Sequence, residues 1–141
     1  MADKTTQSAN DVVNYLVRNV APSWDGASTL YVSLHTGAVG LGGDQLTNEV
    51  VYTGYARIPI TRSGAGGFNA AAAGVAATNL LLQFGTCTGG TLPQVVTHAS
   101  LGENASGAGT VIVTAALASS ITVNINSVPQ FAIGTMTVGE Q

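Results

Sequence analysis

The spacing of apolar residues changes once along this chain of 141 residues, near Thr29. Before that point, between Ser8 and Val20, apolar residues recur at intervals of three and four, which is the period of an amphipathic helix. After it, short runs that alternate apolar with polar residues are separated by clusters of Gly, Ser, Asn and Pro, as in strands joined by turns. We therefore expect a mainly β fold that begins with one short α-helix.

The predicted helix spans residues 8–20 and ends before Pro22, because the residue before a proline disfavours helical backbone angles. Ser8 can cap its first turn, and the carboxylate of Asp11 suits the positive end of the helix dipole. The apolar positions form one stripe, which must lie either against the domain's own sheet or against a neighbouring subunit. These positions are Val12, Val13, Leu16, Val17 and Val20.

The clearest predicted strand is Thr29–His35, in which every second residue is a leucine or a valine. Six later segments have a similar character: residues 55–61, 79–84, 94–101, 110–117, 120–125 and 131–138. No helix is predicted between them, so the strands should pair antiparallel in a sandwich or a barrel. At this length we expect one core, with residues 1–28 as an N-terminal arm and helix and residues 29–141 as the β-domain.

Three further features fall outside this pattern of strands. The segment Gly37–Asn48 carries four glycines and is long enough to act as an arm that contacts another protein. The Ala-rich segment Ala70–Ala77 has little side-chain volume, so we expect a loop that can lie close to another surface. Trp24, the only tryptophan, either buries its ring to hold the helix against the sheet or anchors a partner.

Charged residues make up only 8% of the chain, against roughly 25% in ordinary soluble proteins. The four basic residues are scattered, so no patch can neutralise several phosphates and we expect no nucleic-acid partner. No apolar run is long enough to span a membrane and no secretory signal is present, so we expect synthesis in the cytoplasm and no membrane partner. The single cysteine, Cys87, excludes an intramolecular disulfide and a cysteine-rich zinc site.

The sequence offers little for catalysis. Both histidines, His35 and His98, lie inside predicted strands, where a hydrogen-bonded structural role is the simpler interpretation. The G-x-S-x-G motif of a serine nucleophile and the phosphate-binding G-x-x-x-x-G-K-[ST] motif are both absent. A hydrolase that pairs a histidine with Glu49 is the alternative, but we expect no enzyme activity, no metal and no cofactor.

Several motifs resemble a family of small virion proteins of tailed bacteriophages. The family pattern is Leu-Tyr-(Val/Leu)-Ser-Leu-His-Thr, a Gly-rich loop and Asn-Glu-Val-x-Tyr-Thr-Gly-Tyr-Ala-Arg, which correspond here to Leu30–Thr36 and Asn48–Arg57. The later motifs are Cys87-Thr-Gly-Gly90 with Val96-Thr-His98, and Phe131-Ala-Ile-Gly134. The resemblance covers residues 29–138 and departs from the family in the loop after His35, which reads Gly37-Ala-Val-Gly40 instead of Ala-Asp-Pro-Gly.

This resemblance implies a jelly-roll-like β-sandwich in a structural virion protein. Members often carry a tail-fibre label, and related small β-proteins act as cement or decoration proteins. The main hypothesis is a capsid cement protein that binds the outer face of the major capsid protein lattice, stabilises the phage head and self-associates as a homodimer or homotrimer. The alternative is a tail-fibre or tail-tip component that binds a receptor or carbohydrate through exposed Tyr31, Tyr52 or Tyr55.

We expect partner contacts from the N-terminal helix, from Trp24 and from the loop of residues 37–48. Arg57 and Arg62 are expected to pair either with Glu49 or with acidic residues of the capsid. The scarcity of charge also favours a surface shared with neighbours, because burying Lys or Glu is costly. The candidate contact residues are Val12, Val13, Leu16, Val17, Trp24, Leu41, Asp44, Leu46, Arg57 and Arg62.

Overall fold

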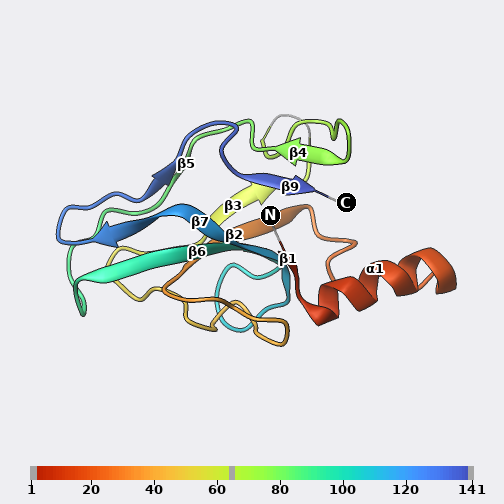
Figure 1. Cartoon of the computed structure of the whole chain (residues 1–141), viewed down its shortest axis with the longest axis horizontal. Coiled ribbons are helices and arrows are strands. Elements are labelled where there is room, and N and C mark those ends of the chain that lie inside the picture. Colours follow the sequence, from red (N-terminus) through yellow and green to blue (C-terminus); the bar gives the residue numbers. More distant parts are fainter. Residues whose placement is uncertain (1–2, 64–65, 140–141) are drawn as a thin grey trace.

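A computed structural model describes residues 3–63 and 66–139 of the chain, and in these residues it contains one helix and nine strands (Figure 1). The elements are β1 (Asp3–Lys4), α1 (Thr6–Arg18), β2 (Thr29–His35), β3 (Ile58–Thr61), β4 (Val75–Ala77), β5 (Leu82–Gln83), β6 (Gln94–Gly102), β7 (Val111–Val123), β8 (Gln130–Phe131) and β9 (Thr137–Gly139).

The largest sheet has five antiparallel strands in the order β1-β7-β6-β2-β3. Two smaller antiparallel pairs join β4 with β9 and β5 with β8. The prediction of a mainly β fold with antiparallel strands and one short N-terminal helix is confirmed. The jelly-roll arrangement stays a prediction, and so does the division of the chain at residue 28.

The hydrophobic core lies between the five-stranded sheet and the two small pairs. Leu34 of β2 and Val96 of β6 are fully buried in one cluster with Leu82 of β5. Phe131 of β8 and Met136, from the segment between β8 and β9, pack against the same cluster. The small pairs therefore form a partial second layer over the sheet, because apolar faces of a sheet must be covered by another element.

The strand β2 has the bounds that its alternation predicts. Both of its faces are covered, because Ser33 and His35 are as fully buried as Leu34. The cover on the polar face is the loop after β2, where Gln45 is fully buried and its amide donates a hydrogen bond to the Ser33 hydroxyl, at 3.3 Å. A strand with polar residues on one face is thus buried on both, with the loop supplying hydrogen bonds to the polar side.

The two strands predicted at residues 110–117 and 120–125 are wrong as separate elements, because β7 runs without a break from Val111 to Val123. The Ser-rich stretch between them is not a turn. It is a bulge. Val96 pairs with Ile121 and His98 pairs with Ala116, so two residues along β6 correspond to five residues along β7. A bulge accommodates extra residues by bending the strand rather than by ending it.

Other predicted strands are shorter than expected. The segment of residues 55–61 becomes extended only at Ile58, and that of residues 79–84 forms a strand only at residues 82–83. The strand predicted at residues 131–138 is wrong, because a turn with Gly134 at φ 79° separates β8 from β9. The loop predicted at residues 70–77 contains the short strand β4, which pairs with β9.

The helix begins and ends two residues earlier than predicted. Its N-cap is Thr5, not Ser8: the Thr5 hydroxyl accepts a hydrogen bond from the Ser8 backbone N–H at 3.2 Å. The same hydroxyl donates to the carbonyl oxygen of Val111 at 2.6 Å, which joins the start of α1 to β7. As a result, Asp11 lies beyond the first turn of the helix. The last helical residue is Arg18, and Asn19, whose backbone is left-handed (φ 53°), forms the C-cap.

Candidate interaction surface

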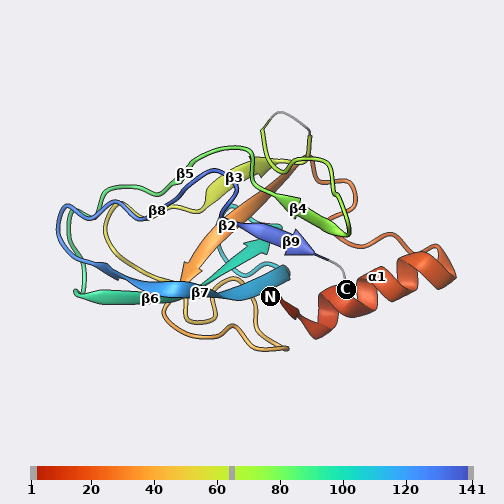
Figure 2. The ribbon, with the colours of Figure 1, turned by 45° about the horizontal axis from the view of Figure 1, so that its top comes forward.

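The helix α1 turns its apolar face away from the rest of the molecule. Leu16 is 75% exposed and Val17 is 72% exposed; Val13 is also exposed, and so is Val20, which lies just beyond the C-cap Asn19. In both views the helix extends beyond the end of the five-stranded sheet (Figures 1 and 2). The opposite side of its first turns faces the β-strands, where Ser8 is fully buried.

This arrangement answers the question that the sequence leaves open, namely whether the apolar stripe of the helix lies against its own sheet. Within the described residues, α1 has its main contacts with β1 and β7, and only Val12 of the stripe is partly buried. An apolar helix face left in water is unfavourable, and such patches in soluble proteins mark interaction sites. The four residues Val13, Leu16, Val17 and Val20 are called the α1 stripe below.

The loop after β2 adds a second exposed apolar position near the start of the helix. Leu41 is 67% exposed, and its carbonyl oxygen accepts a hydrogen bond from the backbone N–H of Thr6 at 2.8 Å. Leu46, two residues after Asp44, is also exposed. The Asp44 carboxylate bonds within its own loop, where it accepts hydrogen bonds from the backbone N–H of Leu46 at 2.9 Å and that of Thr47 at 3.1 Å. Asp44 therefore shapes the loop and leaves its leucines exposed.

Arg57 lies inside the fold. Its guanidinium forms a two-point ion pair with Glu49, with both N–O distances 2.7 Å, and it also donates to the carbonyl oxygens of Asn104 and Gly107 at 2.9 Å. The hydrogen bond to Glu49 is the main reason why the pKa of Arg57 is raised above its ordinary value. Arg57 was expected to pair either with Glu49 or with acidic residues of the capsid, and in the structure it pairs with Glu49.

Arg62 and Trp24 hold the segment between α1 and β2. One guanidinium nitrogen of Arg62 donates to three carbonyl oxygens of this segment, those of Trp24, Asp25 and Ala27, at 2.6, 3.0 and 2.9 Å. The guanidinium carbon lies 5.6 Å from the centre of the Trp24 ring, within the range of a cation–π interaction. Trp24 is half-buried against the core, as its structural role requires, and its role as a partner anchor stays a prediction.

The buried histidine has a serine partner but no access for a substrate. His35 Nε2 lies 2.8 Å from Ser100 Oγ, and Nδ1 lies 2.8 Å from the carbonyl oxygen of Thr47. Both His35 and Ser100 are fully buried, and neither lines any of the three main grooves in the described part of the chain. Burial is the chief reason why the pKa of His35 is lowered from its ordinary value of 6.5. The pair supports the sheet through hydrogen bonds.

The tyrosines considered for receptor binding do not form an exposed set, so that expectation is wrong for Tyr52, which is 4% exposed. Burial raises the pKa of Tyr52 to about 12, and its hydroxyl donates to the carbonyl oxygen of Gly85 at 3.0 Å. The Tyr55 hydroxyl accepts from the Leu34 backbone N–H at 3.0 Å and donates to Glu49 at 2.9 Å. The hydroxyl groups of Tyr52 and Tyr55 thus hold loops in place, whereas Tyr31 and Tyr55 each stay partly exposed.

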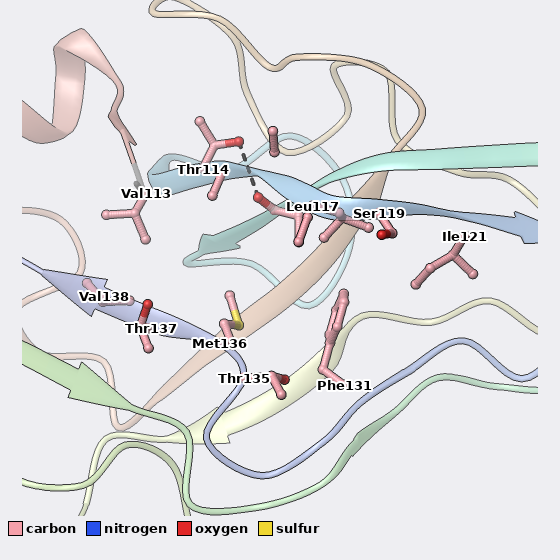
Figure 3. A pocket seen from close by; sticks show the side chains of 14 residues that line it. Val113, Thr114, Leu117, Ser119, Ile121, Phe131, Thr135, Met136, Thr137 and Val138 are labelled. Atoms are coloured by element: carbon pink, nitrogen blue, oxygen red, sulfur yellow. Dashed lines mark hydrogen bonds between the residues drawn. The ribbon is translucent and has the colours of Figure 1, made fainter.

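A groove of about 410 Å³ is the feature that the sequence analysis missed. It lies between β7 and the segment from Phe131 to Val138, and Figure 3 shows Leu117 and Ile121 directed toward Phe131 and Met136 across it. One sequence signal could have indicated it: between Arg62 and Glu140 the only Asp, Glu, Lys or Arg residue is Glu103. The groove is therefore lined without a single charged side chain.

The described residues contain no group of three or more His, Cys, Asp or Glu side chains that could hold a metal ion. No helix within residues 3–63 and 66–139 is long and apolar enough to cross a membrane. Fold and surface together are those of a β-structured protein with an uncovered apolar helix face and an uncharged groove.

Comparison with known families agrees with the resemblance seen in the motifs. The family model described as Gp80, Podophage GP4 fiber I protein gp80, matches residues 3–139. The chain belongs to this family of tailed-phage virion proteins. No curated protein matches the chain.

Proposed function

We propose that this protein is a structural subunit of a tail fibre of a tailed phage and that the α1 stripe attaches it to other protein in the fibre. The family description supports a fibre rather than the cement role on the head, because it calls the family's namesake a fiber protein. The observation that carries the attachment is the exposure of Leu16 and Val17 on a helix that contacts its own domain with the other side.

The surface properties support a structural role in an assembly. Burying an uncharged surface avoids the desolvation cost of Lys and Glu side chains, so a chain with so few charges is suited to extensive contacts. Repetition of the subunit along a fibre would make each weak contact effectively stronger, because neighbours hold one another at high local concentration.

The location can be tested by labelling intact virions with gold-conjugated antibody against this protein and imaging them by electron microscopy. The proposal expects gold on the tail fibres. Gold confined to the head surface would reject the fibre assignment and would instead support a cement or decoration protein on the capsid exterior.

The attachment surface can be tested with the substitution Leu16→Asp, which places a charge in the α1 stripe. We expect phage that carry this variant to lose the protein from purified particles, as measured by quantitative mass spectrometry of virion proteins. The matched control is Asn14→Asp in the same helix, which lies off the stripe and keeps an oxygen toward Arg18, now 3.5 Å from Asn14 Oδ1. Equal incorporation of both variants would contradict the role of the stripe.

A further inference from the structure

Among the described residues, the α1 stripe and the groove beside β7 are both uncovered apolar surfaces, and they lie on different parts of the fold. The stripe cannot fill the groove of its own chain. Its helix is fixed at the N-terminal end by the Thr5 hydrogen bond to Val111 and by the pairing of β1 with Val113 and Thr114, and its apolar face is directed away from the sheet. Each copy thus has one apolar protrusion and one apolar recess that stay unmatched in isolation.

The groove is open because the two layers of the fold are not closed along β7. On its outer side, β7 pairs only with the two residues of β1, so among the described strands nothing continues the sheet beside residues 115–123. The bulge in β7 bends this edge, which makes it a poor template for another strand. The groove between Leu117, Ile121, Phe131 and Met136 is therefore better suited to receive side chains than to pair with a backbone.

The groove has room for the small side chains of the α1 stripe. The stripe consists of three valines and one leucine, so only short branched side chains need to enter the groove. The groove has about 410 Å³. Within the helix the stripe from Val13 to Val17 is about 6 Å long at 1.5 Å per residue, and Val20 follows just beyond the C-cap, while β7 runs beside the groove for at most about 26 Å. The stripe fits within that length.

Charge also favours this pairing over contacts with a charged partner. The groove is lined by no Asp, Glu, Lys or Arg residue, and the α1 stripe contains none either. The charges of the helix, Asp11 and Arg18, are seven residues apart and therefore share one side, off the stripe. A second copy of the chain can thus bring its stripe to the groove without burying a charge.

From these observations we propose that subunits associate head to tail, with the α1 stripe of one copy seated in the β7 groove of the next. This proposal deepens the fibre assignment, because it names the partner that covers the stripe. A contact between two different surfaces leaves each end of the assembly free to add another subunit, so it builds a ring or a filament instead of a closed dimer.

Complementation between two variants tests this arrangement. Leu16→Asp removes the protrusion and keeps the groove, whereas Ser119→Asp places a charge in the groove and keeps the protrusion. Ser119 is exposed and lines the groove, and the neighbouring Ser120, which is also exposed but does not line it, provides the control Ser120→Asp on the same strand. Far-ultraviolet circular dichroism of each variant confirms that the fold is kept.

The measurement is the mass in solution by analytical ultracentrifugation across a range of concentrations. The wild type and Ser120→Asp should exceed twice the chain mass of 14.1 kDa, and each of the variants Leu16→Asp and Ser119→Asp alone should stay at 14.1 kDa. An equimolar mixture of these two variants should form a one-to-one complex, because one intact stripe meets one intact groove.

Three results would overturn the proposal: a monomeric wild type at every concentration, association of Ser119→Asp like that of the wild type, or no complex in the mixture. Loss of association in Leu16→Asp together with normal association of Ser119→Asp would assign the stripe to a helix–helix contact instead. Because the experiment uses purified protein, its failure is distinct from that of the virion labelling, which tests the fibre assignment itself.

Discussion

At the scale of single residues, Arg57 and Glu49 show how this chain uses the few charges that it has. Their ion pair is almost completely buried, with side chains that are 2% and 9% exposed, and Tyr55 adds a third hydrogen bond to the carboxylate. A buried ion pair of this kind gives modest net stability when complete but is costly to break, because the remaining charge is left without its partner. Both residues belong to the Asn48–Arg57 motif, which the family resemblance had identified.

The substitution Glu49→Gln should lower the free energy of unfolding by about 3–5 kcal/mol, because it leaves the guanidinium of Arg57 buried without its counter-charge. Urea denaturation followed by tryptophan fluorescence would measure the change. Asp25→Asn, at an exposed acidic residue, is the control and should change stability by less than about 0.5 kcal/mol. A similar small effect for both variants would contradict a structural role of the pair.

His35 makes the stability of the fold depend on pH. Burial lowers its pKa in the folded state, further helped by Arg57 and His98, while the Thr47 carbonyl and Glu49 act in the opposite direction. Below pH 6.5 the unfolded chain therefore binds a proton at this site more readily than the folded chain does. The stability contributed by neutral His35 is complete above about pH 6.5 and decreases as the pH falls below that value.

We accordingly expect the free energy of unfolding to fall between pH 7.5 and pH 5, by up to about 1.4 kcal/mol for each pH unit in the steepest part. Chemical denaturation at a series of pH values would show this slope. The variant His35→Gln should be less stable overall and should have a flatter profile over the same range. A profile of unchanged slope in that variant would assign the effect to other groups.

At the scale of elements, the helix is the part whose existence could be predicted and whose partner could not. Its 3.6-residue period is local and survives in the structure, but the cap depends on Thr5, whose hydroxyl bonds both the helix and Val111, more than a hundred residues away. Ser8 is a reasonable cap by sequence alone, yet it is the third residue of the helix. The sequence does not indicate that the residues before the helix, Asp3 to Thr5, are held by β7.

Replacement of the N-cap should affect the whole helix. Thr5→Ala removes two hydrogen bonds at a residue that is 2% exposed, and we expect a loss of about 1–2 kcal/mol of stability together with reduced helical circular dichroism. The neighbouring Thr6→Ala is the matched control, because Thr6 is exposed and its side chain does not cap the helix. Equal losses in the two variants would mean that α1 does not depend on this cap.

The strands were predictable in proportion to how local their signals are. Thr29–His35 combines a strict alternation with clear flanking residues, and its bounds are correct. The segment from Ala118 to Ser120 has no strand signal of its own, and its extended form depends on the pairing of β7 with β6 on either side. The groove beside β7 could not be predicted from the sequence for the same reason, because its two sides come from segments that meet only in the folded molecule.

At the scale of the whole molecule, the distribution of charge predicts how association should respond to salt. If an apolar stripe seats in an apolar groove, no ion pair is formed at the contact, so screening by salt has little to weaken. We expect association of the wild type to be nearly unchanged between about 0.05 and 0.5 M sodium chloride and to become stronger in sodium sulfate, which favours apolar burial.

Sedimentation of the wild type in these buffers would provide the test. A steep loss of association as sodium chloride rises would indicate that exposed charges such as those of Arg62 or Arg18 make the contact, contrary to the apolar arrangement. The corresponding measurement on Ser120→Asp would show whether an added charge outside the groove alters this response.

The way in which α1 is joined to the β-domain has a mechanical consequence. The start of the helix is tied to β7 through Thr5 and β1, and the segment that follows its end is tied down where Arg62 holds the carbonyl oxygens around Trp24. A force applied to the helix is thus distributed over two attachment points, one at each end of the helix. In a filament under tension, such a subunit would resist being peeled open from its N-terminus.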